Sequence, residues 1–363
     1  MIALALVTLA ALFVAYTNGA NDNFKGVATL FGSGTTSYRK ALAWGTVTTL
    51  AGSVTALVFS EKLVSRFSGK GLVPDALVGD PHFVGAVALA AALTVFLATW
   101  LAFPISTTHA LTGALVGAGL VRAHGEVHLG VLGTAFFLPL VASPVMAMAL
   151  SLLFYPTVHG LRTRAGIRRE TCVCLNREWV PVALAPDGAA LGGTGTLSLE
   201  TCQERYQGTL FSITAHRLLD GAHYLSAGAV SFARGLNDTP KIVALLVAAH
   251  AMGLRGGMVL VGLVMAVGAV LHARKVAETM SHKITKMNHG QGFSANLVTA
   301  ALVVVASRFG LPVSTTHVSC GALFGIGMVT RQARWKMIGS VLLAWVITLP
   351  TAAVFSAVAA KLL

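Results

Sequence analysis

The sequence is short of charged residues. Charged side chains make up 11% of the 363 residues and hydrophobic ones 55%, whereas soluble domains are about one quarter charged. Cysteine is also scarce, and Cys172, Cys174 and Cys202 form a Cys-x-Cys pair and one distant residue, which falls short of a zinc site. The scarcity of charge excludes an ordinary soluble domain and indicates a protein embedded in lipid.

Long apolar runs recur along the chain, and a run of about 20 residues is enough to cross the hydrocarbon core of a bilayer. The first run has no positively charged segment before it and no small-residue cleavage site after it, so we interpret it as a helix and not as a signal peptide. We therefore predict an all-α, polytopic membrane protein with about ten full and half spans. The clearest runs are Ile2–Tyr16, Ala41–Ser60, Phe83–Phe103, Val127–Tyr155, Met258–His272, Asn296–Ser307 and Ile338–Leu362.

The formal net charge of +13 comes from Lys and Arg residues that cluster between the apolar runs. Short basic loops usually stay in the cytoplasm, and no basic segment is interleaved with aromatic residues in the manner of a nucleic-acid groove. The charge therefore indicates membrane topology and contact with anionic lipid. We expect a multi-pass protein of the cell (inner or plasma) membrane that binds no nucleic acid.

Two motifs occur twice, in the same order. Residues 19–22 (Gly-Ala-Asn-Asp) match residues 235–238 (Gly-Leu-Asn-Asp), 216 positions later, and Lys, Val, Ala and Leu follow both at the same spacings. Residues 103–109 (Phe-Pro-Ile-Ser-Thr-Thr-His) match residues 311–317 (Leu-Pro-Val-Ser-Thr-Thr-His), 208 positions later. The repetition indicates a duplication.

The duplication divides the chain into a first transmembrane repeat (1–155), a polar, basic cytoplasmic loop (156–217) and a second transmembrane repeat (218–363). The loop contains one plausible strand, Trp179–Leu184. Duplicated halves in a membrane protein are typical of transporters that bind substrate between the repeats. If each half crosses the membrane an odd number of times, the second half is inverted relative to the first, and we expect this inversion.

Asp22 and Asp238 are acidic residues placed between apolar stretches, at equivalent positions of the repeats. A charge at the bilayer centre costs about 2.5–3.5 kcal/mol on insertion scales, so each carboxylate needs a compensating partner. They either pair with Lys25 and Lys241 or cap a broken helix, or they bind a coupling cation or accept a proton from an oxyanion.

The segment Thr17–Asn23 is small and polar within an apolar region, which predicts an interrupted helix lining a cavity. The helix would resume at Lys25, with Asn and Asp capping it. Backbone carbonyls freed by such a break suit Na⁺. The residues proposed to hold this ion are Asn21, Asp22, Asn237 and Asp238.

The Pro-x-Ser-Thr-Thr-His motifs have the composition of helix starts, because proline suits the first turn of a helix. Hydroxyls beside unpaired backbone N–H groups and the positive end of the helix dipole form an anion site. The hydroxyls alternatively only cap the helices, and His109 and His317 are equally compatible with a structural role. The predicted anion site combines Asp22 and Asp238 with the hydroxyls of Ser106, Thr107, Thr108, Ser314, Thr315 and Thr316.

Both pairs of motifs resemble the signatures of the inorganic phosphate transporter family, and the resemblance covers both halves. It implies phosphate import coupled to Na⁺ or H⁺, an inverted-repeat fold and a homodimer. We expect no cofactor besides the coupling ion. Two departures leave the coupling ion and the anion open. Residues 23–25 are Asn-Phe-Lys where the family usually has Val-Ala-Asn, and Thr49 and Asn296 are neutral where many members have glutamate.

Sulfate permeases of the same superfamily are the first alternative. Phosphate is favoured because it carries a proton that a carboxylate can accept. An anion channel is a second alternative, although buried carboxylates between repeats favour a carrier. No catalytic or metal-ligand motif is present, so we expect no enzyme activity. A receptor or scaffold would leave the paired intramembrane aspartates unexplained.

Overall fold

The computed structural model describes residues 2–164, 168–177, 197–207, 209–210 and 213–363. The chain divides into two compact units. One comprises Met1–Val158 and Asp220–Leu363, and the other His159–Leu219.

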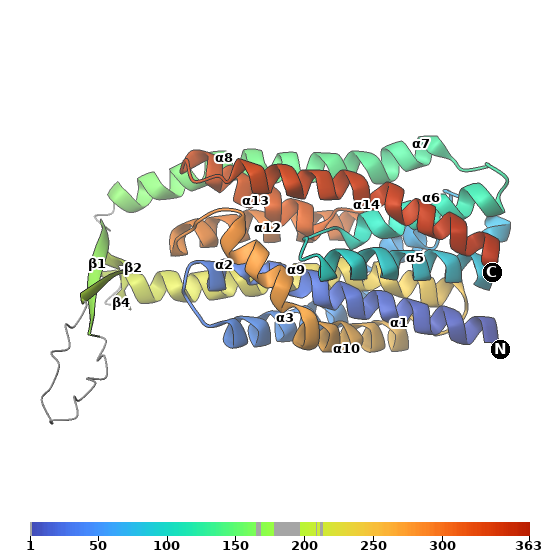
Figure 1. The fold of residues 1–363 in the computed structure, drawn as a ribbon, viewed down its shortest axis with the longest axis horizontal. Helices are drawn as coiled ribbons and strands as arrows, with labels where there is room; N and C mark the ends of the chain where they lie inside the picture. The colour runs from blue at the N-terminus through green and yellow to red at the C-terminus, as the bar shows by residue number, and fades with distance from the viewer. Residues whose placement is uncertain (1, 165–167, 178–196, 208, 211–212) are drawn as a thin grey trace, which may run out of the picture. The chain divides into compact units, whose positions relative to one another are not determined.

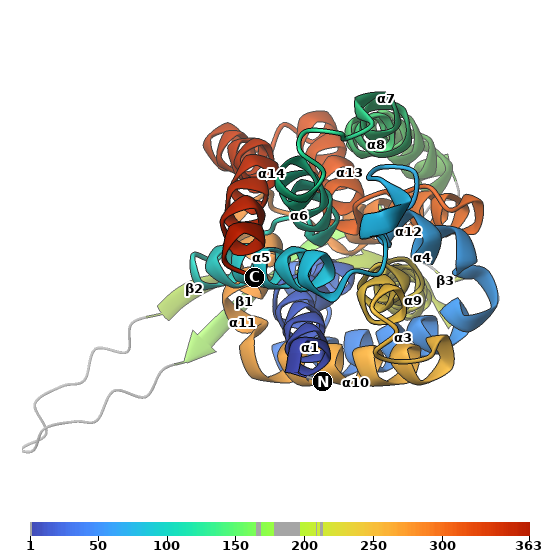
Figure 2. The same ribbon diagram turned by 90° about the vertical axis from the view of Figure 1, so that its right-hand side faces the viewer.

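The first unit is helical (Figures 1 and 2). Short 3₁₀ segments occur at Asn23–Gly26 and Asp75–Leu77, and π-helical turns at Leu132–Phe137 and Thr279–Lys283. Its helices, two of which extend into the second unit, are α1 (Ile2–Asp22), α2 (Ala28–Gly32), α3 (Tyr38–Phe59), α4 (Glu61–Phe67), α5 (Pro81–Trp100), α6 (Thr107–Arg122), α7 (Leu129–Val131), α8 (Leu138–Arg164), α9 (Ala215–Ala248), α10 (Leu254–His272), α11 (Arg274–Glu278), α12 (His289–Phe309), α13 (Thr315–Val329) and α14 (Trp335–Leu362).

Among the described residues, 7 helical segments are long and apolar enough to cross a membrane. Each apolar run named from the sequence falls on one of them, so the predicted polytopic helical fold is confirmed. Helix α9 has 34 residues, long enough to cross a bilayer, and carries Arg234, Asp238 and Lys241 in its interior.

The second unit contains strands that the all-α prediction did not include. Strand β1 (Arg168–Arg177) pairs antiparallel with β2 (Leu197–Gln207), and β3 (Thr209–Leu210) pairs with β4 (Ile213–Thr214). The predicted strand Trp179–Leu184 lies outside the described residues. The three-part division of the chain and the cytoplasmic side of the loop remain predictions.

Small residues let the helices of the first unit pack closely, as is usual in membranes. On α6, Gly113 and Gly117 lie against the backbone carbonyls of Leu349 and Ala353 on α14, where a Cβ atom would not fit. The same close approach joins α1 to α10. Helix α5 packs against α1, α6 and α14, so these five helices form one packed group.

Helices at corresponding places in the two predicted repeats run in opposite directions. In Figure 1, α1 starts at the marked N-terminus and runs away from that end of the molecule, whereas α9 runs toward it. Helix α8 runs away from the end at which α14 reaches the C-terminus. Opposite directions are what an inverted repeat requires, and the inversion itself remains a prediction.

The predicted break in the first helix occurs later than expected. Helix α1 stays helical through Asp22, and the change comes at the 3₁₀ segment Asn23–Gly26 and at Val27, with φ −112° and ψ 6°. The polar side chains of residues 17–22 find partners on other segments, so they do not compete for the backbone of their own helix.

The equivalent break in the second half is absent from the described chain. Helix α9 continues through Asn237 and Asp238 and contains Pro240. The second half therefore keeps a continuous helix where the first half changes at Asn23–Gly26 and Val27. The reason is again tertiary, since Asn237 and Asp238 bond to the segment before α13 and to its first turn.

Candidate functional site

Helices α6 and α13 begin where the Ser-Thr-Thr-His motifs predict. The side chain of Ser106 accepts a hydrogen bond from the backbone N–H of His109 at 3.1 Å, and Ser314 accepts one from His317 at 3.2 Å. Both serines have extended backbone and are N-caps. Two equivalent half-helices therefore start inside the unit, each with its positive dipole end at the motif.

Asp22 is buried, with 1% of its surface exposed. It forms an ion pair with Lys25, and its Oδ2 atom accepts hydrogen bonds at 2.9 Å from Asn18 Nδ2 and from Thr107 Oγ1. The carboxylate thus joins α1 to the first residue of α6. Lysine pairing, which the sequence left open, is present, and it provides the compensation that a buried charge needs.

Asp238 has an equivalent environment. Its Oδ1 atom lies 3.2 Å from Lys241 Nζ, and its Oδ2 accepts a hydrogen bond from Thr315 Oγ1 at 3.3 Å. Arg234 Nε lies 3.7 Å from Oδ2. Both predicted aspartates thus contact the first residue of a half-helix.

The motif asparagines hold the extended segments that precede the half-helices. Asn21 Nδ2 donates to the carbonyl of Phe103 at 3.0 Å, and Asn21 Oδ1 accepts from the N–H of Ile105 at 3.2 Å. Asn237 Nδ2 donates to the carbonyl of Val313 at 3.1 Å. The asparagines therefore fix the position of each Pro-x-Ser-Thr-Thr segment.

Each lysine reaches across to the other motif. Lys25 Nζ donates to Thr316 Oγ1 at 2.6 Å, and Lys241 Nζ donates to Thr108 Oγ1 at 2.7 Å. The threonine hydroxyls also cross over, since Thr316 donates to the carbonyl of Ile105 at 2.8 Å and Thr108 to that of Val313 at 3.3 Å. These reciprocal contacts bring all the predicted site residues into one cluster where the two sets of motifs meet.

Arg234 belongs to this cluster and was missed by the sequence interpretation, which assigned basic residues to loops. It is 1% exposed. Its guanidinium donates to Asn18 Oδ1 at 2.5 Å, to Asn23 Oδ1 at 2.9 Å and to Thr49 Oγ1 at 3.3 Å. Its place in a motif-bearing apolar segment, one residue before Gly235, is the signal that could have identified it.

The paired histidines lie next to each other, in the first turns of α6 and α13. The ring centroids of His109 and His317 are 4.3 Å apart, and His317 stacks on Trp345 with centroids at 3.7 Å. Both histidines line an apolar cavity of 730 Å³. No hydrogen bond in the described chain links either imidazole to the carboxylates, so a structural role and a functional role remain open.

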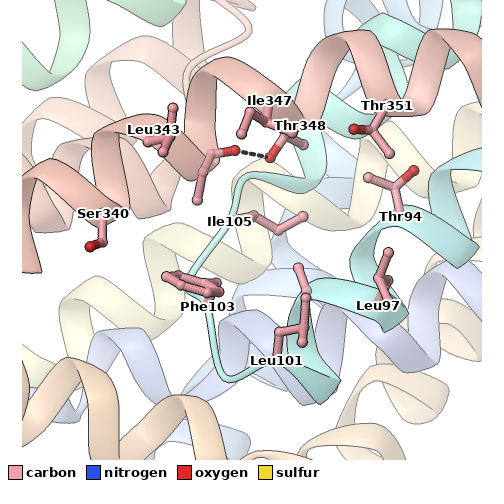
Figure 3. Close-up of a pocket in the computed structure, with 12 residues that line it drawn as sticks. Thr94, Leu97, Leu101, Phe103, Ile105, Ser340, Leu343, Ile347, Thr348 and Thr351 are labelled. Carbon is pink, nitrogen blue, oxygen red and sulfur yellow. Dashed lines mark hydrogen bonds between the residues drawn. The ribbon is translucent and has the colours of Figure 1, made fainter.

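A second cavity, of 340 Å³, lies between α5, α14 and the segment before α6. Its wall is largely apolar, and the hydroxyl of Thr348 donates back to the carbonyl of Ala344 on its own helix (Figure 3). Neither cavity is lined by Asp22 or Asp238. Both are largely apolar cavities beside the polar cluster, since Ile105, whose carbonyl accepts from Lys25, lines the smaller one.

The charges buried in the described membrane helices all lie in this cluster. They are the carboxylates of Asp22 and Asp238 and the cationic groups of Lys25, Arg234 and Lys241, which leave one positive charge in excess. Ionisable residues inside the membrane are expensive and mark substrate or ion pathways. A net positive cluster at two helix N-termini is suited to an anion.

Known proteins resemble the chain over almost its whole length. The model of the phosphate transporter family matches residues 18–356. The chain is 26% identical to a Pyrococcus abyssi protein named as a phosphate permease, over 99% of this chain and 98% of that one. It is 29% identical to a Rhizobium meliloti protein named as a low-affinity inorganic phosphate transporter, over 96% of this chain and 92% of that one.

Among solved structures, the chain resembles a sodium-dependent phosphate transporter with a TM-score of 0.75 and 20% identity, covering 100% of this chain and 99% of the other. Identity this low shows a shared fold and does not transfer an activity. The family and the similar proteins are transporters, which argues against an enzyme.

Proposed function

Since the chain belongs to the phosphate transporter family, we propose that this multi-pass membrane protein is a secondary transporter that imports inorganic phosphate across the plasma membrane. The observation that carries the proposal is the cluster in which Asp22, Asp238 and three buried cationic side chains lie at the N-terminal ends of α6 and α13. A tetrahedral oxyanion needs several converging donors, and this cluster supplies them from both halves.

The donors proposed for the anion are hydroxyls and backbone N–H groups of the two half-helices. The hydroxyls of Thr108 and Thr316 donate hydrogen bonds to carbonyls of the opposite motif. With phosphate bound, each hydroxyl would donate to a phosphate oxygen instead. Asp22 and Asp238 would accept the proton of a protonated phosphate or hold the threonines of the first turn. Ser106, Thr107, Ser314 and Thr315 complete the proposed set.

The reciprocal contacts favour a carrier over an anion channel. Lys25 to Thr316 and Lys241 to Thr108 tie the two sets of motifs together at the cluster, so the motifs contact each other directly. Movement of one half against the other would break these contacts and open the cluster to one side at a time. A sulfate permease is the alternative for the anion, and a homodimer is proposed from the family resemblance.

We further propose that a cation gradient drives import, with Na⁺ and H⁺ as the two candidates. Carboxylate and amide oxygens of Asn21, Asp22, Asn237 and Asp238 are the predicted Na⁺ ligands. A solved structure of similar fold is that of a sodium-dependent phosphate transporter. This similarity of fold supports the proposal that a cation gradient drives import.

The test is uptake of ³²P-phosphate by the purified protein in liposomes, with unlabelled arsenate and sulfate as competitors. We expect saturable uptake that arsenate inhibits and that Asp22→Asn and Asp238→Asn each abolish. Uptake of labelled sulfate without phosphate uptake would favour the sulfate permease. Flux that does not saturate would favour the channel.

A further inference from the structure

The ammonium group of Lys25 lies in a cage of oxygen atoms. Its Nζ atom contacts the carboxylate of Asp22, Asn21 Oδ1 at 2.8 Å, the carbonyl oxygen of Ile105 at 2.7 Å and Thr316 Oγ1 at 2.6 Å. Carboxylate, amide, carbonyl and hydroxyl oxygens are the ligands that a hard cation prefers. Lys25 is 3% exposed, so its ammonium is enclosed by these atoms.

Lys241 occupies an equivalent cage in the second half. Its Nζ atom lies 3.2 Å from Asp238 Oδ1, 2.8 Å from the carbonyl oxygen of Val313 and 2.7 Å from Thr108 Oγ1. Three of the four partners of Lys25 recur here, because Asp238, Val313 and Thr108 are equivalent to Asp22, Ile105 and Thr316; the fourth does not, because Asn237 Oδ1 accepts from Ser307 instead. A lysine ammonium has three protons to donate, and each one has an acceptor here.

These contacts conflict with a coupling Na⁺ at the same place. An ion bound to Asp22 would need the oxygens that Lys25 Nζ contacts, and an ion bound to Asp238 would need those around Lys241. Two added Na⁺ ions would also raise the excess of positive charge in the cluster, which Arg234 already makes positive. The predicted ligands Asn21, Asp22, Asn237 and Asp238 therefore do not fit Na⁺ while the lysines are in place.

We propose that Lys25 and Lys241 are tethered cations that take the place of a coupling Na⁺, so that phosphate transport by this protein needs no Na⁺. The proposal rests on the proposed function, because it concerns the ion that accompanies phosphate. The remaining candidate for coupling is the proton. A proton that travels on the phosphate monoanion suits this cluster, because one bound negative charge would cancel the excess positive charge.

The first experiment measures binding of ²²Na⁺ to the purified full-length protein, without any transport. We expect no saturable binding to the wild type and saturable binding to Lys25→Ala, in which the cage keeps its oxygens and gains room. Lys25→Met is the matched control, because its side chain fills the space without a charge, and it should bind no Na⁺. Lys241→Ala is the second test variant if Lys25→Ala does not fold.

Two results of this experiment would overturn the proposal. One is saturable ²²Na⁺ binding to the wild type that Asp22→Asn removes, because the ion would then share the cage with the lysine. The other is a folded alanine variant that binds no Na⁺, because the cage would then not be a cation site.

The second experiment replaces Na⁺ by choline in the liposome assay. We expect the initial rate of phosphate uptake to change by less than about twofold, whereas an uptake that falls more than about tenfold, equivalent to 1.4 kcal/mol, contradicts the proposal. Absence of phosphate uptake in both media would contradict the proposed function instead. The ²²Na⁺ measurement would still decide whether the lysines replace the ion.

Discussion

Arg234 and Asn18 stand at equivalent places in the repeated segments, 216 positions apart, and they contact each other directly, with Arg234 Nη2 donating to Asn18 Oδ1 at 2.5 Å. Two equivalent residues that touch mark the place where the halves meet. They also differ in charge, so the pseudo-symmetric cluster is asymmetric at its contact point. The extra cation of Arg234 gives the cluster its net positive charge.

Removal of Arg234 should damage both folding and transport. Arg234→Gln would lose the bonds to Asn18, Asn23 and Thr49, and loss of one member of a buried charge network costs about 3–5 kcal/mol. We expect a lower thermal unfolding temperature in detergent. We also expect phosphate uptake to fall at least about tenfold, because a loss of only about 1.4 kcal/mol in the free energy of anion binding lowers affinity tenfold.

The control for this variant is Arg274→Gln, because the Arg274 side chain is 78% exposed and makes only weak contacts in the described chain, an ion pair with Glu278 and a position 5.8 Å from the centroid of the Tyr38 ring. It should leave both measurements nearly unchanged. Arg234→Lys keeps the charge without the planar fork and should retain part of the uptake. Full uptake by Arg234→Gln would show that the excess charge plays no part in transport.

The reciprocal lysine–threonine contacts should be equally important in the two halves. Thr316→Val and Thr108→Val each remove the hydroxyl that accepts from a lysine, which leaves a buried ammonium with one partner fewer at a cost of about 1–3 kcal/mol. We expect both variants to lose phosphate uptake to a similar degree, and Thr316→Ser and Thr108→Ser to recover most of it.

Thr94→Val is the matched control for the threonine variants. Thr94 is also buried, but among the described residues its hydroxyl donates only to the carbonyl of Ala90 on its own helix. Uptake should therefore be close to that of the wild type. Strongly unequal losses in Thr316→Val and Thr108→Val would contradict an equivalent role for the two motifs.

Local sequence patterns were sufficient to predict the elements of the site. The Pro-x-Ser-Thr-Thr-His motifs place helix starts at Thr107 and Thr315, and both are present because a serine cap specifies a helix start through local geometry. The expectation that proline occupies the first turn is wrong, since Pro104 and Pro312 lie two residues before the caps. The repetition also identified Asp22 and Asp238, because a motif that occurs twice can be recognised without knowledge of tertiary contacts.

Tertiary contacts were not predictable in the same way. The segment around Asn21 reads as a broken helix because its polar side chains have no partners in the sequence, yet α1 stays helical through Asp22 when Thr99, Thr107 and Phe103 supply those partners. The sequence predicts that carbonyls freed by a break in this helix bind a cation. In the structure, the carbonyls that contact the ammonium groups of Lys25 and Lys241 belong to Ile105 and Val313, in the extended segments before α6 and α13. The crossing of each lysine to the other half also depends on contacts between residues far apart in sequence.

Close packing of α6 on α14 should be intolerant of a single methyl group. Gly117→Ala would place a Cβ atom against the backbone of Ala353, and backbone cannot move aside as a flexible side chain can. We expect a clear fall in thermal unfolding temperature, consistent with overpacking costs of about 1–3 kcal/mol. Gly339→Ala on α14 meets nothing within 4 Å and should be neutral or slightly stabilising. Equal stability of the two variants would show that α6 and α14 do not approach this closely.

The charge balance of the cluster predicts which ionic form of phosphate is carried. Three cationic side chains and two carboxylates leave one positive charge, which a monoanion neutralises and a dianion overcompensates. In the liposome assay at fixed total phosphate, we expect the initial rate to fall as the external pH rises through the range in which the monoanion loses its proton. Arsenate has the same charge states and should compete, whereas sulfate, always a dianion at neutral pH, should compete weakly. A rate that follows the dianion concentration, or strong competition by sulfate, would show that the cluster binds the anion with a second net positive charge, which requires one of the two carboxylates, Asp22 or Asp238, to be protonated.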